Sequence, residues 1–128
     1  MFARFAARHD LEFEIARDVP VEVLWTFPAQ PKLAMPLTLG MSNSDELHFG
    51  VERFWTYLFP FPEVAEEFER WLDAWVIGEA RIAKTSKRGR IFQLWTGQEW
   101  EKVYSSDERW FFRKEPFGFI DHKTKAQI

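Results

Sequence analysis

The sequence predicts an α+β fold in which a curved antiparallel sheet packs on one central amphipathic helix at residues 62–77, followed by a C-terminal β-meander. Three observations support this prediction. Apolar and polar residues alternate along several short segments, as in strands with one buried face. One central segment has apolar residues at helical spacing. Short turns, one of them built on Gly97, separate the alternating segments that follow.

The composition predicts a core built on aromatic rings. The chain has 128 residues, 18% of them aromatic, and no cysteine, so disulfides and thiolate metal sites are excluded. We expect a single domain over 1–128, with frayed ends at 1–10 and 122–128. The formal charge of −3 argues against general nucleic-acid binding. The sequence has no signal-peptide or membrane-spanning pattern, so we expect a cytoplasmic protein that does not enter membranes.

The first alternating segments lie near the N-terminus. Residues 11–16 alternate apolar and acidic side chains and predict a half-buried strand. Residues 18–27 fit either a strand or a short helix that starts at Pro20, and their alternation favours the strand.

The next region, 28–46, contains three prolines and lacks a period, which predicts a long loop. Its apolar Leu37, Leu39 and Met41 predict that it lies over the core or contacts a partner. Alternation returns at 47–59, and we expect one strand there.

The amphipathic helix at 62–77 has the clearest boundaries. Pro62 suits a first helical turn, acidic residues follow it, and Gly78 marks the end. The apolar stripe contains two indoles and is expected to face the sheet. Its members are Val64, Phe68, Trp71, Leu72 and Trp75.

Several short strands follow the helix. We expect strands at 80–85, 91–96 and 99–105, with further short strands at 109–114 and 117–120. The Gly97-Gln98 turn predicts a hairpin that sets Trp95 opposite Trp100 and Ile91 opposite Tyr104.

Aromatic residues are the main candidates for binding. Trp95, Trp100, Tyr104 and Trp110 are expected to form a ladder on one sheet face. That face is either the inner wall under the helix or an outward platform for a partner. A ligand carrier would instead enclose a pocket lined by Trp25, Trp55 or Trp95.

Polar candidates are fewer. His48 and Glu52 fall on one face of the expected strand and could act as acid and base, although a solvated strand face is the favoured explanation. Lys87, Arg88 and Arg90 could bind an anion or keep a turn soluble. We expect no metal site and no cofactor, because catalytic and phosphate-binding motifs are missing.

The run from Glu14 to Trp25 resembles the opening of START-type lipid-binding proteins, in which a strand precedes a Pro-Val-Glu-x-Leu/Val-Trp motif. That family ends in a long helix, whereas here the predicted helix is central, so the family is not adopted. An NTF2-like or START-like architecture around a small apolar ligand enters only as an alternative.

The sequence therefore favours a non-enzymatic binding module whose partner is another protein, with a second copy of the chain as one candidate. A carrier of a small apolar ligand is the first alternative. A small hydrolase or isomerase that uses His48 and Glu52 is the second.

Overall fold

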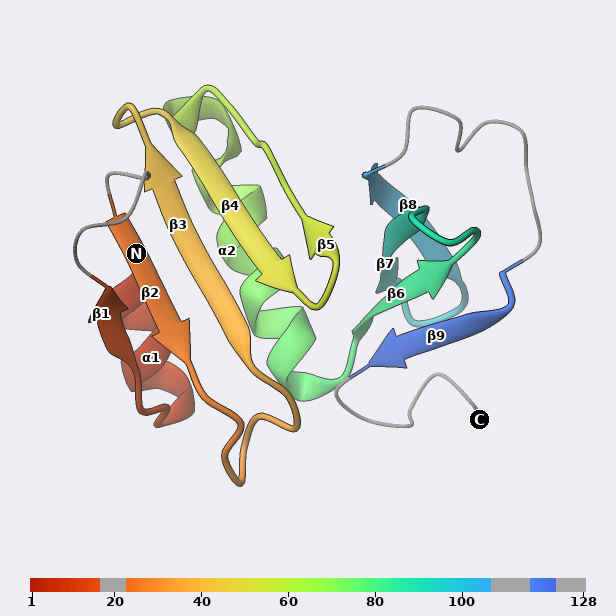
Figure 1. Cartoon of the computed structure of the whole chain (residues 1–128), viewed down its shortest axis with the longest axis horizontal. Helices are drawn as coiled ribbons and strands as arrows, with labels where there is room; N and C mark the ends of the chain where they lie inside the picture. The colour runs from red at the N-terminus through yellow and green to blue at the C-terminus, as the bar shows by residue number, and fades with distance from the viewer. Residues whose placement is uncertain (17–22, 107–115, 122–128) are drawn as a thin grey trace. The chain divides into compact units, whose positions relative to one another are not determined.

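The computed structural model describes residues 1–16, 23–106 and 116–121. The chain divides into two compact units, Met1–Asp73 and Ala74–Ile128, and each is described by itself. The described residues form two helices and nine strands in two antiparallel sheets, which confirms the predicted α+β class (Figure 1). The expectation of a single domain stays a prediction.

The first unit contains a five-stranded sheet in which each strand pairs with the next along the chain. Figure 1 shows helices α1 (Phe2–His9) and α2 (Phe61–Ile77) on one face of this sheet. All pairs are antiparallel, as hairpin connections require. The strands are β1 (Glu14–Ala16), β2 (Val23–Phe27), β3 (Leu37–Ser42), β4 (Glu46–Val51) and β5 (Phe54–Trp55).

Rings from both helices and from β2 fill the core of this unit. The Phe5 ring lies edge-on to Phe27, with centroids 5.6 Å apart, and Phe2 lies 6.4 Å from Phe68. Phe49 continues this layer on β4 and is fully buried. Burial of such rings is the main stabilising contribution that these elements make.

The predicted central helix is confirmed, beginning one residue earlier than expected. The Asp45 carboxylate accepts a hydrogen bond of 3.0 Å from the backbone N–H of Phe61, which satisfies one exposed donor at the helix start. Gly78 follows the last helical residue with φ 85°, a conformation that suits glycine at a helix end. No described helix is long and apolar enough to cross a membrane.

Two expectations for the first unit are wrong. Residues 1–10 are not frayed, because α1 buries Phe2, Phe5 and Ala6 against the sheet. The expected loop at 28–46 contains β3, which pairs with both β2 and β4.

Leu37, Leu39 and Met41 all lie on β3. Leu37 and Leu39 are fully buried, so they belong to the core and not to a partner-contact loop. Strand β2 confirms the extended interpretation of 18–27 from Val23 onward, while 18–22 lie outside the described residues.

The single strand expected at 47–59 is instead a hairpin. Glu52 has φ 52°, a left-handed conformation that turns the chain, so that β5 runs back along β4. Trp55 therefore pairs with Gly50 across the hairpin and does not extend the same strand beyond Val51, as a single strand over 47–59 would require.

The second unit contains a four-stranded antiparallel sheet with the order β8-β7-β6-β9 (Figure 1). The expected strands at 80–85, 91–96, 99–105 and 117–120 are confirmed, and 109–114 lies outside the described residues. Gly97 has φ 100° at the turn, as expected for its place in the hairpin. The strands are β6 (Ala80–Lys84), β7 (Arg90–Trp95), β8 (Trp100–Ser105) and β9 (Gly118–Asp121).

The hairpin register agrees with the prediction at one end only. Trp95 lies opposite Trp100, as predicted. An irregularity between Phe92 and Gln93 then shifts the pairing, so Ile91 faces Ser105 and not Tyr104. One face of this sheet is almost completely buried, and Trp75 of α2 lies against its Phe92 with ring centroids 6.4 Å apart. Its buried residues are Ala80, Ile82, Phe92, Leu94 and Ile120.

Candidate functional site

The opposite face of the four-stranded sheet carries the strongest candidate site. Cross-strand pairing places Asp121, Arg81, Gln93 and Lys102 in one row across β9, β6, β7 and β8. Because neighbours in such a row point to the same side, this polar row lies on the side away from Phe92. We call it, with the adjoining Trp95, Trp100 and Phe119, the Arg81 face.

Arg81 is held by three side chains of this face. Its guanidinium carbon lies 4.3 Å from the centroid of the Trp100 ring and 3.9 Å from that of Phe119. Both distances are within the range of cation–π attraction. Its Nε also donates a hydrogen bond of 2.6 Å to Oε1 of Gln93. The guanidinium is therefore fixed in position between two rings.

Electrostatics at Arg81 reflect this enclosure. Partial burial lowers the pKa of Arg81, because the charged form loses contact with water, and the Asp121 carboxylate partly opposes the effect. An arginine remains protonated at neutral pH in such a setting. The site thus presents a fixed and incompletely hydrated positive charge.

Aromatic surface continues on both sides of the polar row. Trp95 and Trp100 are half-buried, and their ring centroids lie 5.3 Å apart. Phe119 on β9 is 44% exposed. Next to Lys102, at the irregular end of β8, lies a hollow of about 300 Å³. It is lined by Ile91, Lys102, Val103, Tyr104 and Ser105.

The predicted aromatic ladder is only partly assembled. Trp95 and Trp100 lie together on the Arg81 face, opposite the side that receives the helix. Tyr104 stands opposite Phe92 because of the register shift. Trp110 lies outside the described residues.

The other two predicted pocket residues lie in the first unit, on opposite faces of its sheet. Trp25 stacks on Phe13 with centroids 4.3 Å apart and is in the cross-strand row of Phe49. Trp55 lies opposite Gly50, the residue after Phe49, and therefore points to the other side. These two indoles do not line a common pocket.

His48 lies on the same side of the five-stranded sheet as Trp55 and is only 2% exposed. Its Nδ1 is 2.8 Å from the Thr56 carbonyl oxygen. A carbonyl can only accept, so Nδ1 donates to it, and Nε2 lies 2.8 Å from the Ser42 hydroxyl oxygen. Trp55 stacks on the imidazole with centroids 5.0 Å apart.

The proposed pairing of His48 with Glu52 is wrong. Glu52 is exposed in the β4–β5 turn, whereas Glu46 places Oε1 3.3 Å from His48 Nε2. Sequence reasoning missed Ser42, because the β3–β4 hairpin that sets it beside His48 lay within the expected loop. Both ring nitrogens of His48 have protein partners, which is the usual state of a buried histidine.

The three basic residues proposed to bind an anion do not act together. Arg90 is buried, and its Nη1 donates to the carbonyl oxygens of Ser86 and Gly89, so it braces the β6–β7 turn. Lys87 and Arg88 are exposed in that turn.

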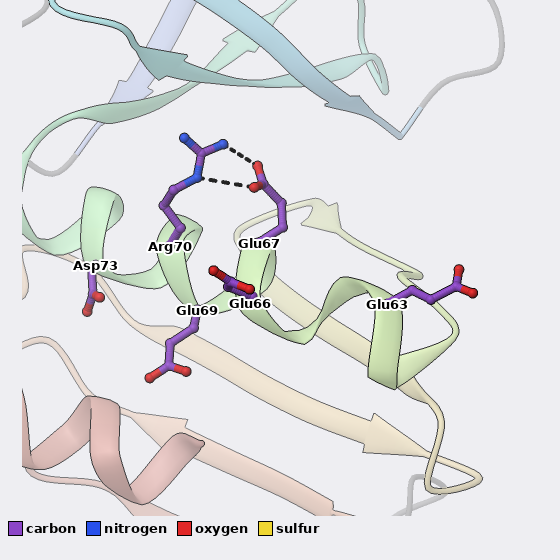
Figure 2. Close-up of a pocket in the computed structure, with 6 residues that line it drawn as sticks. All are labelled: Glu63, Glu66, Glu67, Glu69, Arg70 and Asp73. Atoms are coloured by element: carbon purple, nitrogen blue, oxygen red, sulfur yellow. Dashed lines mark hydrogen bonds and ion pairs between the residues drawn. The ribbon is translucent and has the colours of Figure 1, made fainter.

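Acidic residues gather on α2 around an open hollow of about 580 Å³ (Figure 2). Most of them already have basic partners. Glu69 accepts hydrogen bonds from Arg4 and Arg8 of α1, and Asp73 accepts from Arg8 and His9. Figure 2 shows the Glu67–Arg70 pair on the other side of the helix. This surface therefore joins the two helices.

Within the ranges 1–16, 23–106 and 116–121, no three His, Asp or Glu side chains are grouped to hold a metal ion. No protein-family model, no curated protein and no solved structure matches this chain.

Proposed function

We propose that this chain is a non-enzymatic binding module that contacts a protein partner through the Arg81 face. The observation that supports the proposal is the arginine held by Trp100 and Phe119 on the sheet face opposite the buried Phe92. Trp and Arg are the residues most enriched among those that contribute most to protein–protein affinity. A side chain that is already fixed loses little entropy when a partner binds.

The residue types around Arg81 support the same proposal. The Arg81 face combines partly exposed rings with a few charged groups, as the central parts of protein interfaces do. On the five-stranded sheet, the candidate His48 is instead buried and has partners for both nitrogens.

A small apolar ligand is the second candidate. The hollow beside Lys102 has a volume of about 300 Å³, at the lower end of the range for ligand pockets. It does not involve Trp25 or Trp55, so a carrier of this kind would differ from the predicted enclosed aromatic pocket.

A photo-crosslinking amino acid at position 119 tests the protein-binding proposal in cells that naturally contain the protein. We expect a covalent adduct with one dominant partner, lost when Arg81→Gln is combined with the probe. The same probe at position 15, where Ile15 is 53% exposed on β1, is the control. Equal adducts from both positions, or none from position 119, would contradict the proposal.

A further inference from the structure

We propose that the Arg81 face binds an acidic segment of the partner, with Asp or Glu side chains over Arg81 and Lys102 and apolar side chains on the neighbouring rings. This inference rests on the proposed function and specifies the chemistry of the partner. It combines the charge of the polar row, the geometry of the guanidinium and the apolar surface on either side.

Charge supports an acidic partner. The polar row contains two cations, Arg81 and Lys102, and one carboxylate, Asp121. The chain as a whole has a formal charge of −3, so this local excess of positive charge runs against the overall balance. Complementary potentials of this kind steer the encounter of two proteins and select the partner.

The guanidinium geometry specifies a carboxylate. The guanidinium carbon lies over two rings, and Nε is already bonded to Gln93. Nη1 and Nη2 have no hydrogen-bond partner among the residues that the structure describes. Two parallel N–H donors in a fixed plane match the two oxygens of a carboxylate.

Incomplete hydration adds to this preference. Burial already disfavours the charged form of Arg81, which its lowered pKa shows. A bound carboxylate would compensate for the water that the rings displace. An exposed lysine or arginine, such as Arg88 in the β6–β7 turn, gains less from the same contact because water already solvates it.

Apolar surface lies on both sides of the polar row. Trp95 and Trp100 flank it on one side, and Phe119 lies on the other. The hollow at the irregular part of β8 has Lys102 among its lining residues and is large enough for an apolar side chain. A segment whose contacting side presents both acidic and apolar side chains would therefore match the charged and the apolar parts of this face.

Titration of the full-length chain with designed peptides tests this inference. The probe is a twelve-residue peptide in which pairs of Glu alternate with pairs of Leu, so that each side of the extended peptide carries both residue types. The matched control peptide has Gln at each Glu position. Binding is followed through the indole N–H resonances of Trp95 and Trp100. We expect the Glu peptide to shift both resonances and the Gln peptide to bind at least about tenfold more weakly, since each tenfold step is about 1.4 kcal/mol.

Variants assign the effect to named residues. Arg81→Gln should weaken binding of the Glu peptide about tenfold and Lys102→Gln by less, because Lys102 is exposed. Arg88→Gln removes the same charge from the β6–β7 turn and should leave binding unchanged. Higher salt should weaken binding to the unaltered chain.

Four results would overturn the inference. Equal binding of the Gln peptide would show apolar docking, which leaves the proposed function intact. Shifts produced equally by inorganic phosphate would indicate a general anion site. No binding of the Glu peptide, together with a partner adduct at position 119, would exclude an acidic partner only. No binding and no adduct would remove both proposals.

Discussion

Each of the two sheets has one face that packs in the core of its unit, and the two sheets differ in how their other face is built. In the five-stranded sheet, Gly40 and Gly50 leave room for large rings to lie flat on that face. Trp55 covers Gly50 and stacks on His48, whose two nitrogens have partners within the unit. This face is closed by its own side chains.

In the four-stranded sheet, the corresponding face has a charged row and partly exposed rings. Arg81 lies over the Trp100 and Phe119 rings, and the Asp121 carboxylate of the same row acts on it electrostatically. Partly exposed rings and charged groups contribute little to the stability of the fold. They are available to a partner. The comparison separates residues that hold the protein together from those that we propose to bind.

The largest expected difference lies between the two faces of the four-stranded sheet. Phe92→Ala should lower the free energy of unfolding by about 3–5 kcal/mol, because Phe92 is fully buried against Trp75. Trp100→Ala should cost less, about 1 kcal/mol, because Trp100 is half-exposed. Urea-induced unfolding followed by far-UV circular dichroism measures both. Equal losses would mean that the Arg81 face belongs to the core.

A second comparison uses glycines of the two sheets. A Cβ added at Gly50 would lie 2.5 Å from the Trp55 ring, so Gly50→Ala must displace that ring from His48. Overpacking of this kind should cost about 2 kcal/mol. At Gly118 the nearest atom is 3.7 Å away, at the flexible Lys84 side chain, so Gly118→Ala should change stability by less than about 0.5 kcal/mol. Thermal unfolding of both variants checks the contrast, which a stable Gly50→Ala protein would contradict.

Sequence reasoning was most successful where local signals agree. The central helix has a proline start, a glycine end and a continuous apolar stripe, and the hairpin at Gly97 has a turn residue with the required positive φ. These signals need no knowledge of distant segments.

Elements that depend on distant contacts were missed. Helix α1 is short, and its Arg4 and Arg8 are held by carboxylates of α2 more than sixty residues away. The turn at Glu52 lacks the Gly or Asn that usually marks a left-handed residue. Strand β3 was missed because the prolines that precede it indicated a loop.

The part of the candidate site that depends on local sequence was predicted, and the part that depends on distant strands was not. Trp95 and Trp100 are joined by a short turn, so their pairing follows from local sequence. Arg81 meets Phe119 only because β9 adds to the sheet beside β6 and not beside the strand that precedes it in the described chain. Pairing of non-consecutive strands leaves no local signal, so Arg81 was not among the predicted site residues.

A third prediction compares one hydroxyl from each unit. Thr56 is fully buried, and its Oγ1 accepts the backbone N–H of Phe49 at 2.8 Å. Thr56→Val leaves that buried donor without an acceptor and should cost about 1–2 kcal/mol. Thr96 accepts from Gln98 and Glu99 in the exposed hairpin turn, where water can replace it, so Thr96→Val should cost less. Urea unfolding distinguishes the two variants, and equal costs would mean that the burial of Thr56 does not matter.

The smallest expected effect concerns charges that are paired within the first unit, in contrast to Arg81. Hydrogen bonds from Arg4 and then Arg8 lower the pKa of Glu69. The folded state therefore binds this proton less readily than the unfolded chain, so the contribution is present above the ordinary glutamate pKa of about 4.3 and is lost as the pH falls through the lowered value.

Glu69→Gln should consequently lower the free energy of unfolding at pH 7 by about 0.5–1 kcal/mol, the usual size for partly exposed ion pairs. The difference from the unaltered chain should shrink as the pH falls from about 4 through the lowered pKa of Glu69, below which the carboxylate is protonated in both states. Glu66→Gln, on the same helix, is the matched control because Glu66 has no ion pair with any described residue. Urea unfolding at several pH values follows the effect. If Glu69→Gln lowered the free energy of unfolding by the same amount at low pH, Glu69 would act through packing. Paired charge would then not distinguish the helix surface of the first unit from the Arg81 face.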